Sequence, residues 1–139
     1  MKDDKNTLNK KVLQWIENAD SDLEVAKHSF SIKSCIPYKL IAFHAQQCVE
    51  KYLKAFLVLK KTNFPYTHNI SILLEICSIQ ADWNKSINFA KELTSYAITA
   101  RYPGIDDEVT EDEAKEAVKI SEKVRETVRT ALIQEGLNI

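Results

Sequence analysis

Apolar side chains recur every three or four residues along most of the chain, the spacing that gives an α-helix one buried face. The first stripe predicts a helix over residues 7–30. The second stripe is wider and predicts a central, mostly buried helix over residues 37–61, with Pro37 in its first turn. The two stripes consist of Val12, Trp15, Ile16, Ala19, Leu23, Ala26 and Phe30, then Ile41, Ala42, Ala45, Cys48, Val49, Tyr52, Leu53, Phe56, Leu57 and Leu59.

Three further helices are predicted in the second half of the chain. Pro65 interrupts the pattern, and a short helix follows that Thr67 or Asn69 can cap. A longer helix is predicted over residues 83–100, because the segment Tyr102-Pro103-Gly104 cannot continue it. A capping box of Thr110 with Glu113 predicts the start of the last helix, which Gly136 ends.

These elements predict an all-α fold, an up-and-down antiparallel bundle of four long helices plus one short helix. With 2 glycines and 3 prolines, the chain has too few turn residues for a β-sandwich and no glycine-rich Rossmann loop. Its 139 residues are expected to form one domain, 1–139, with a core at about 7–135. The expected common core includes Trp15, Leu23, Leu53, Phe56, Leu93 and Val124.

Charge is balanced overall but uneven along the chain. The formal net charge is −1, so no global field indicates a nucleic-acid binder. Residues 37–61 carry five lysines and one glutamate, whereas residues 106–116 carry seven acids and one lysine. Two readings stay open: two solvated helix faces, or a basic groove for phosphate and an acidic surface for a partner.

The cysteines and the lengths of the apolar runs indicate in which cellular compartment the protein is expected. Cys35, Cys48 and Cys77 form no CxxC motif and lie among apolar residues, as is typical of reduced thiols in a cytosolic protein. Residues 1–11 are polar, so no signal peptide is expected, and no apolar run approaches the roughly 18 residues of a membrane span. The sequence therefore predicts a cytoplasmic protein.

The common catalytic motifs are missing from the sequence. Di-metal sites in helical bundles need Glu-x-x-His, and none of His28, His44 and His68 has a glutamate three residues before it. There is no phosphate-binding glycine loop, HExxH or GxSxG. No metal and no other cofactor is expected.

Polar residues in unusual places are the remaining candidates for a site. His44, Gln47 and Lys51 fall at i, i+3 and i+7, one stripe beside the apolar face of the second helix. His68 lies at a helix start, and Arg101 lies at a helix break where a guanidinium suits a phosphate. The structural alternatives are a core histidine, a helix cap and a cation on the helix dipole.

Four segments share the order and spacing of a known family. They are the residues WIENAD at 15–20 (with Asp22, Leu23 and Ala26), HAQQCVEKYLKA at 44–55, THNI at 67–70 and ARYPG at 100–104. Together they resemble HEPN domains (higher eukaryotes and prokaryotes nucleotide-binding) over roughly residues 12–134. The resemblance implies a helical bundle, often a homodimer, that associates with nucleotides or RNA.

Within that family, many members act with a minimal nucleotidyltransferase as a two-component toxin–antitoxin or nucleotide-transfer system. Others are metal-independent ribonucleases that use Arg, four to six variable residues, then His. Here Asp106, Asp107 and Glu108 occupy that window after Arg101, and no histidine follows. The departure favours a binding module over an enzyme, because carboxylates repel the phosphates of RNA.

Three functions follow from these observations. The first is a HEPN-like module that binds a nucleotide or RNA phosphate, partners a nucleotidyltransferase, or does both. Its expected phosphate-binding residues are His44, Gln47, Lys51, His68 and Arg101. The second is a diverged metal-independent endoribonuclease toxin, and the third is a purely structural interaction bundle.

Arg101 and its neighbours carry two further expectations. The stripe of the second helix is expected to lie within reach of Arg101, in one polar pocket, whereas the competing account pairs Arg101 with Asp106 or Asp107. An apolar strip near Tyr102-Pro103 is expected to support a two-fold symmetric homodimer.

Overall fold

The computed structural model describes residues 2–99 and 108–139, and all regular structure in those ranges is helical. Three long helices are α1 (Lys2–Ser29), α2 (Tyr38–Leu59) and α5 (Glu111–Gln134). Shorter elements are α3 (Ile70–Ser78), the 3₁₀-helix η1 (Trp83–Leu93) and α4 (Thr94–Thr99). The predicted all-α bundle is confirmed.

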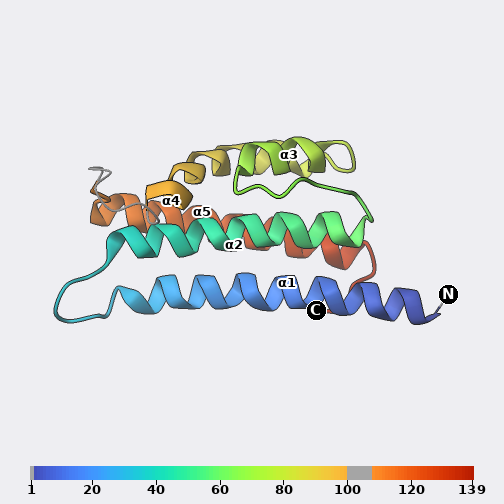
Figure 1. The fold of residues 1–139 in the computed structure, drawn as a ribbon, viewed down its shortest axis with the longest axis horizontal. Helices are drawn as coiled ribbons and strands as arrows, with labels where there is room; N and C mark the ends of the chain where they lie inside the picture. The colour runs from blue at the N-terminus through green and yellow to red at the C-terminus, as the bar shows by residue number, and fades with distance from the viewer. Residues whose placement is uncertain (1, 100–107) are drawn as a thin grey trace.

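Helix α2 is the centre of the bundle. It lies between α1 on one side and α3 on the other, with α5 behind it in the view of Figure 1. It contacts every other helical element, whereas α1 and α5 make a smaller contact with each other. Such a position requires an apolar surface around most of the helix, and α2 has the widest apolar stripe of the chain.

The fourth predicted helix, over residues 83–100, is not a single α-helix. The structure has the 3₁₀-helix η1 followed by the short helix α4, with a non-helical backbone at Ile87 (φ −122°, ψ 17°). The buried residues of η1, Ile87, Ala90 and Leu93, are spaced by three, which matches the three residues per turn of a 3₁₀-helix. Phe89, next to Ala90 in the sequence, falls outside this spacing and is exposed.

The predicted helix ends are mostly correct. Asn69 caps α3 by accepting a hydrogen bond from the Ser71 amide (2.9 Å). Thr110 and Glu113 form the predicted capping box of α5, with both hydrogen bonds at 3.1 Å. Pro37 differs slightly, because it is the residue before α2 rather than part of its first turn.

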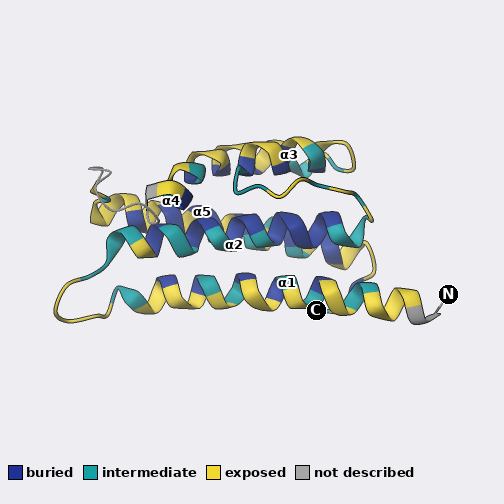
Figure 2. Ribbon diagram, in the orientation of Figure 1, coloured by how far each residue is buried: buried dark blue, intermediate teal, exposed yellow. Residues whose placement is uncertain are grey.

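One core joins the helices. Leu23, Leu53, Phe56, Leu93 and Val124 are buried in it as predicted, while Trp15 is only partly buried at its edge. Figure 2 shows the same division, with buried segments along α2 and exposed outer faces on α1 and α3. None of the helices in the described ranges is both long and apolar enough to cross a membrane.

Candidate functional site

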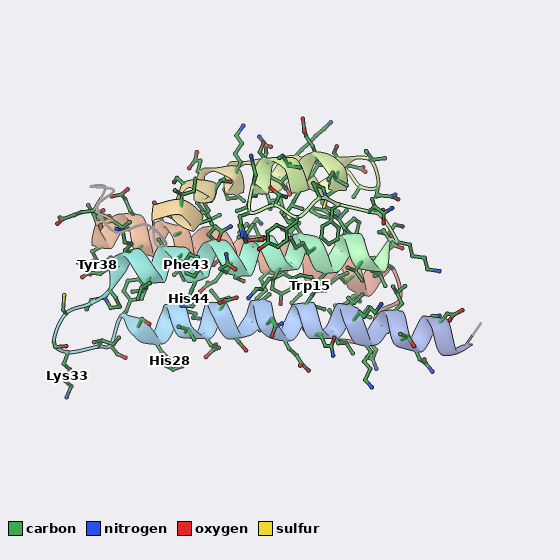
Figure 3. All side chains as sticks on the ribbon, in the orientation of Figure 1. Trp15, His28, Lys33, Tyr38, Phe43 and His44 are labelled. Carbon is green, nitrogen blue, oxygen red and sulfur yellow. The ribbon has the colours of Figure 1, made fainter. Side chains whose placement is uncertain are left out.

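Three of the predicted site residues form a polar strip on α2. His44, Gln47 and Lys51 share one side of the helix, as their spacing predicts, and each is partly exposed. Figure 3 shows His44 in the region between α2 and α1, close to Phe43. The His44 and Phe43 rings meet edge to face, with centroids 5.4 Å apart.

Asp22 of α1 holds both ends of this strip. One carboxylate oxygen accepts a hydrogen bond from His44 Nδ1 (2.8 Å), and the other binds Lys51 Nζ (2.5 Å). Asp22 sits in the segment that resembles the opening of HEPN domains, but the sequence pattern did not mark it as a site residue. Its partners are 22 and 29 residues away, so local spacing could not reveal the contact.

Glu50 connects the strip to His68. Its buried carboxylate accepts hydrogen bonds from His68 Nδ1 (2.9 Å) and Gln47 Nε2 (3.2 Å), and it pairs with Lys54 Nζ (2.8 Å). Gln46 Nε2 bridges Glu50 (3.1 Å) and the backbone oxygen of His68 (3.3 Å). We call His44, Gln47, Lys51 and His68, joined through Asp22 and Glu50, the α2 strip.

Lys54 is the most buried cation in this network. Its ammonium lies against Glu50 and near three aromatic rings, at 5.6 Å from the centroid of Trp15 and 5.9 Å from those of Phe64 and Tyr66. A desolvated ammonium is stabilised by a carboxylate and by the negative faces of such rings. Lys54 therefore holds residues 64–68 against α2 rather than presenting a charge to solvent.

The charges of the α2 strip are layered. The carboxylates lie inside, with exposed side-chain fractions of 3% for Glu50 and 12% for Asp22. The donors lie outside, at 28% for His44, 25% for Lys51 and 28% for His68. Among the described residues, the Nε2 atoms of both histidines have no hydrogen-bond partner, whereas both Nδ1 atoms are held by carboxylates.

A second polar network joins the three long helices. Asp20 of α1 accepts hydrogen bonds from the buried Tyr52 hydroxyl of α2 and from Arg125 Nε of α5 (2.9 Å), and Arg129 approaches it at 3.7 Å. Burial, and then the hydrogen bond to Asp20, raises the pKa of Tyr52, and the same carboxylate raises the pKa of Arg125. All three donors contact the same carboxylate, so this network joins α1, α2 and α5 and has a structural role.

Three lysines of the basic segment 37–61 are paired with carboxylates, one of them within α2 itself. Lys51, Lys54 and Lys60 pair with Asp22, Glu50 and Glu135 respectively. The acidic segment is only partly described, and there Glu111 pairs with Lys115 on the exposed start of α5. Neither interpretation of the charge pattern describes these three lysines fully. They do not lie on a freely solvated helix face, and their carboxylate partners leave no groove with a large positive charge.

Arg101 and its neighbours lie outside the described residues. The expected pocket between Arg101 and the α2 strip, its pairing with Asp106 or Asp107, and the apolar strip near Tyr102-Pro103 therefore stay predictions. Of the other four predicted phosphate-binding residues, His44 and Lys51 share Asp22, and Gln47 and His68 share Glu50.

The cysteines and metal ligands offer no competing centre in the described ranges. Cys48 and Cys77 are buried and Cys35 is exposed, all as free thiols. Burial raises the pKa of the Cys77 thiol to about 12 and that of Cys48 further still, so both stay protonated and unreactive near neutral pH. No three His, Cys, Asp or Glu side chains of the described residues converge as metal ligands do.

Comparisons with known proteins agree on a family. The family model of the HEPN domain matches residues 12–131. The chain is also 30% identical over 135 residues to the protein named "Putative toxin MJ1304" of Methanocaldococcus jannaschii, an alignment that covers 85% of this chain and 86% of that protein. No solved structure gives a match of comparable significance.

Proposed function

The chain belongs to the HEPN domain family, and from that premise we propose that it is a toxin–antitoxin-type module that binds a nucleotide or RNA phosphate. The observation that carries the proposal is the layering of the α2 strip, in which the cationic donors are more exposed than the carboxylates that hold them. The proposed binding residues are His44, Gln47, Lys51 and His68, completed by Arg101.

The chemistry of these donors suits a phosphate. An ammonium has three N–H donors, and Asp22 accepts one hydrogen bond from Lys51, which leaves two for an anion. The histidines keep Nδ1 on a carboxylate, so a protonated ring donates from Nε2 to the ligand. Charge-assisted hydrogen bonds of this kind are the strong ones, and a guanidinium from Arg101 would add a bidentate contact.

We further propose a homodimer and a nucleotidyltransferase partner in the cytoplasm. The toxin name of the archaeal relative supports an antitoxin-like partner. Glu111, Asp112 and Glu116 are exposed near the start of α5 and would give such a partner an acidic surface. Recovery of a nucleotidyltransferase with the chain from its native host would support the pairing, and light scattering that shows only monomer at high concentration would count against the dimer.

Lys51→Gln tests the phosphate site. It should weaken binding of a short single-stranded RNA by about 10-fold, because one charge-assisted contact is lost. It should also reduce the slope of log affinity against log salt by about 0.7, the value for one phosphate contact on a single strand. Fluorescence anisotropy at several salt concentrations measures both quantities, and thermal melting shows that the variant is folded.

Lys60→Gln is the matched control. Lys60 is also paired with a carboxylate, Glu135 at 3.1 Å, and has a similar exposed fraction of 24%, but it lies at the far end of α2. Equal losses from Lys51→Gln and Lys60→Gln would contradict a local site. Arg101→Ala should weaken binding with little change in melting temperature, and RNA cleavage in the presence of a chelator would favour the endoribonuclease alternative.

A further inference from the structure

Tyr66 presents an aromatic ring to solvent beside the α2 strip. Its residue is 89% exposed, so the ring contributes almost nothing to the core. Its centroid lies 5.5 Å from that of His68, at an interplanar angle of 72°, and 5.9 Å from the ammonium of Lys54. The ring is therefore next to a strip residue although it belongs to no helix.

The segment that carries Tyr66 is anchored at several points. His68 is held by Glu50 through its side chain and by Gln46 through its backbone oxygen. Thr67 accepts a hydrogen bond from the Asn69 amide (3.0 Å), and Asn69 caps α3. An aromatic side chain on an anchored segment loses little conformational freedom on binding, since only two of its torsions remain free.

We propose that Tyr66 is a stacking platform for an unpaired nucleobase of single-stranded RNA, while the neighbouring phosphate binds the α2 strip. This inference rests on the proposed phosphate site and deepens it. An aromatic face accepts any base, and its contact with His68 puts the base near that ring, whose Nε2 has no hydrogen-bond partner among the described residues. Gln47, whose amide nitrogen is held by Gln46 and Glu50, keeps its oxygen free among the described residues to accept from a base amine.

The geometry favours single strands over duplexes. In duplex RNA the bases are stacked on each other, and proteins recognise its shape and its 2′-hydroxyl groups instead. A single protruding ring needs a base that is free to leave its neighbours. A mononucleotide carries only one base and one phosphate. Comparing its affinity with that of a single-stranded RNA in the same assay therefore distinguishes a site for a nucleotide from a site for RNA.

Tyr66→Ala is the decisive variant; the residue is 89% exposed and Lys54 keeps its carboxylate and two other rings, so the variant should stay folded. We expect it to bind a single-stranded octanucleotide about 5- to 160-fold more weakly than the wild type, the range of one base–aromatic stack. Tyr66→Phe should bind like the wild type, because it keeps the ring. Phe89→Ala is the matched control, since Phe89 is another exposed aromatic residue but lies in η1.

Two probes separate stacking from phosphate binding. A backbone of the same length without bases should bind the wild type and Tyr66→Ala equally, and a 2-aminopurine in the octanucleotide should be quenched by the wild type and by Tyr66→Phe only. Unchanged octanucleotide binding by Tyr66→Ala, or a wild-type preference for duplex, would overturn the inference while leaving the phosphate site intact. Wild type that binds neither RNA nor a mononucleotide would overturn both.

Discussion

Contacts between residues far apart in the sequence determine the chemistry of the α2 strip. The helical spacing of His44, Gln47 and Lys51 correctly predicts that they share one side of α2. Spacing does not reveal their partners, because Asp22 comes from α1 and His68 follows a turn after α2. A periodic pattern gives the face of a helix, whereas the partner depends on how helices pack against one another.

Glu50 is the residue whose role differs most from the sequence expectation. In the sequence it is the single acid of a basic segment, yet in the structure it is buried and accepts hydrogen bonds from four side chains. Its charge is therefore needed inside the fold. Lysines that appeared free in the sequence are fixed for the same reason, since Lys54 is nearly as buried as Glu50.

Glu50→Gln should destabilise the protein by about 3–5 kcal/mol, because it leaves the ammonium of Lys54 buried without a counter-charge. Urea denaturation measures the change in the free energy of unfolding. Glu111→Gln is the control, since its pair with Lys115 is exposed and screened by solvent and should leave the free energy of unfolding nearly unchanged. The double variant Glu50→Gln/Lys54→Met should recover part of the loss, and equal costs for Glu50→Gln and Glu111→Gln would contradict a structural role for this charge.

At the scale of the helices, local sequence signals predict where a helix begins or ends better than they predict whether it is an α-helix or a 3₁₀-helix. The caps at Asn69 and Thr110 are chemical signals within three residues, and both are present. The prediction of an α-helix over residues 83–93 is wrong, because over so short a stretch the apolar residues fit the period of a 3₁₀-helix as well as that of an α-helix. Asn and Ser also compete for backbone hydrogen bonds there, as Ser86 does with the Trp83 oxygen (2.7 Å).

Thr110→Ala should lower the free energy of unfolding by about 1 kcal/mol, because it removes one half of the capping box of α5. Chemical denaturation gives the value. Thr130→Ala is a suitable control, since Thr130 is exposed inside the same helix and bonds only a carbonyl one turn back. That substitution should be neutral or slightly stabilising, because alanine has the higher helix propensity. A Thr130→Ala loss as large as that of Thr110→Ala would contradict the cap.

At the scale of the molecule, one helix organises both the core and the site. Helix α2 contacts every other helical element of the described residues, and its polar side carries three of the four residues of the α2 strip. The width of the apolar stripe in the sequence predicts this central position. The wide stripe also explains why the bundle fold could be predicted, because a helix that is buried on most sides leaves its neighbours few ways to pack.

Phe56→Ala tests this dependence on α2. Phe56 is buried and meets Trp83 edge to face, with ring centroids 4.8 Å apart, so it joins α2 to η1. Its loss should cost about 3–5 kcal/mol, a large part of the roughly 5–15 kcal/mol that keeps a domain folded. Thermal and urea unfolding measure the cost, and Ile79→Ala, at a position that is 79% exposed, should stay within about 0.5 kcal/mol of the wild type.

The same variant distinguishes a single cooperative bundle from a set of loosely coupled helices. If α2 organises the whole molecule, Phe56→Ala should shift the unfolding of the α1–α2 contact and of the α3–η1 region together, because both pack on α2. Hydrogen exchange followed by mass spectrometry reads the two regions separately. Faster exchange confined to η1 and α3, with α1 and α2 unchanged, would mean that the site can stay intact while the second half of the bundle opens.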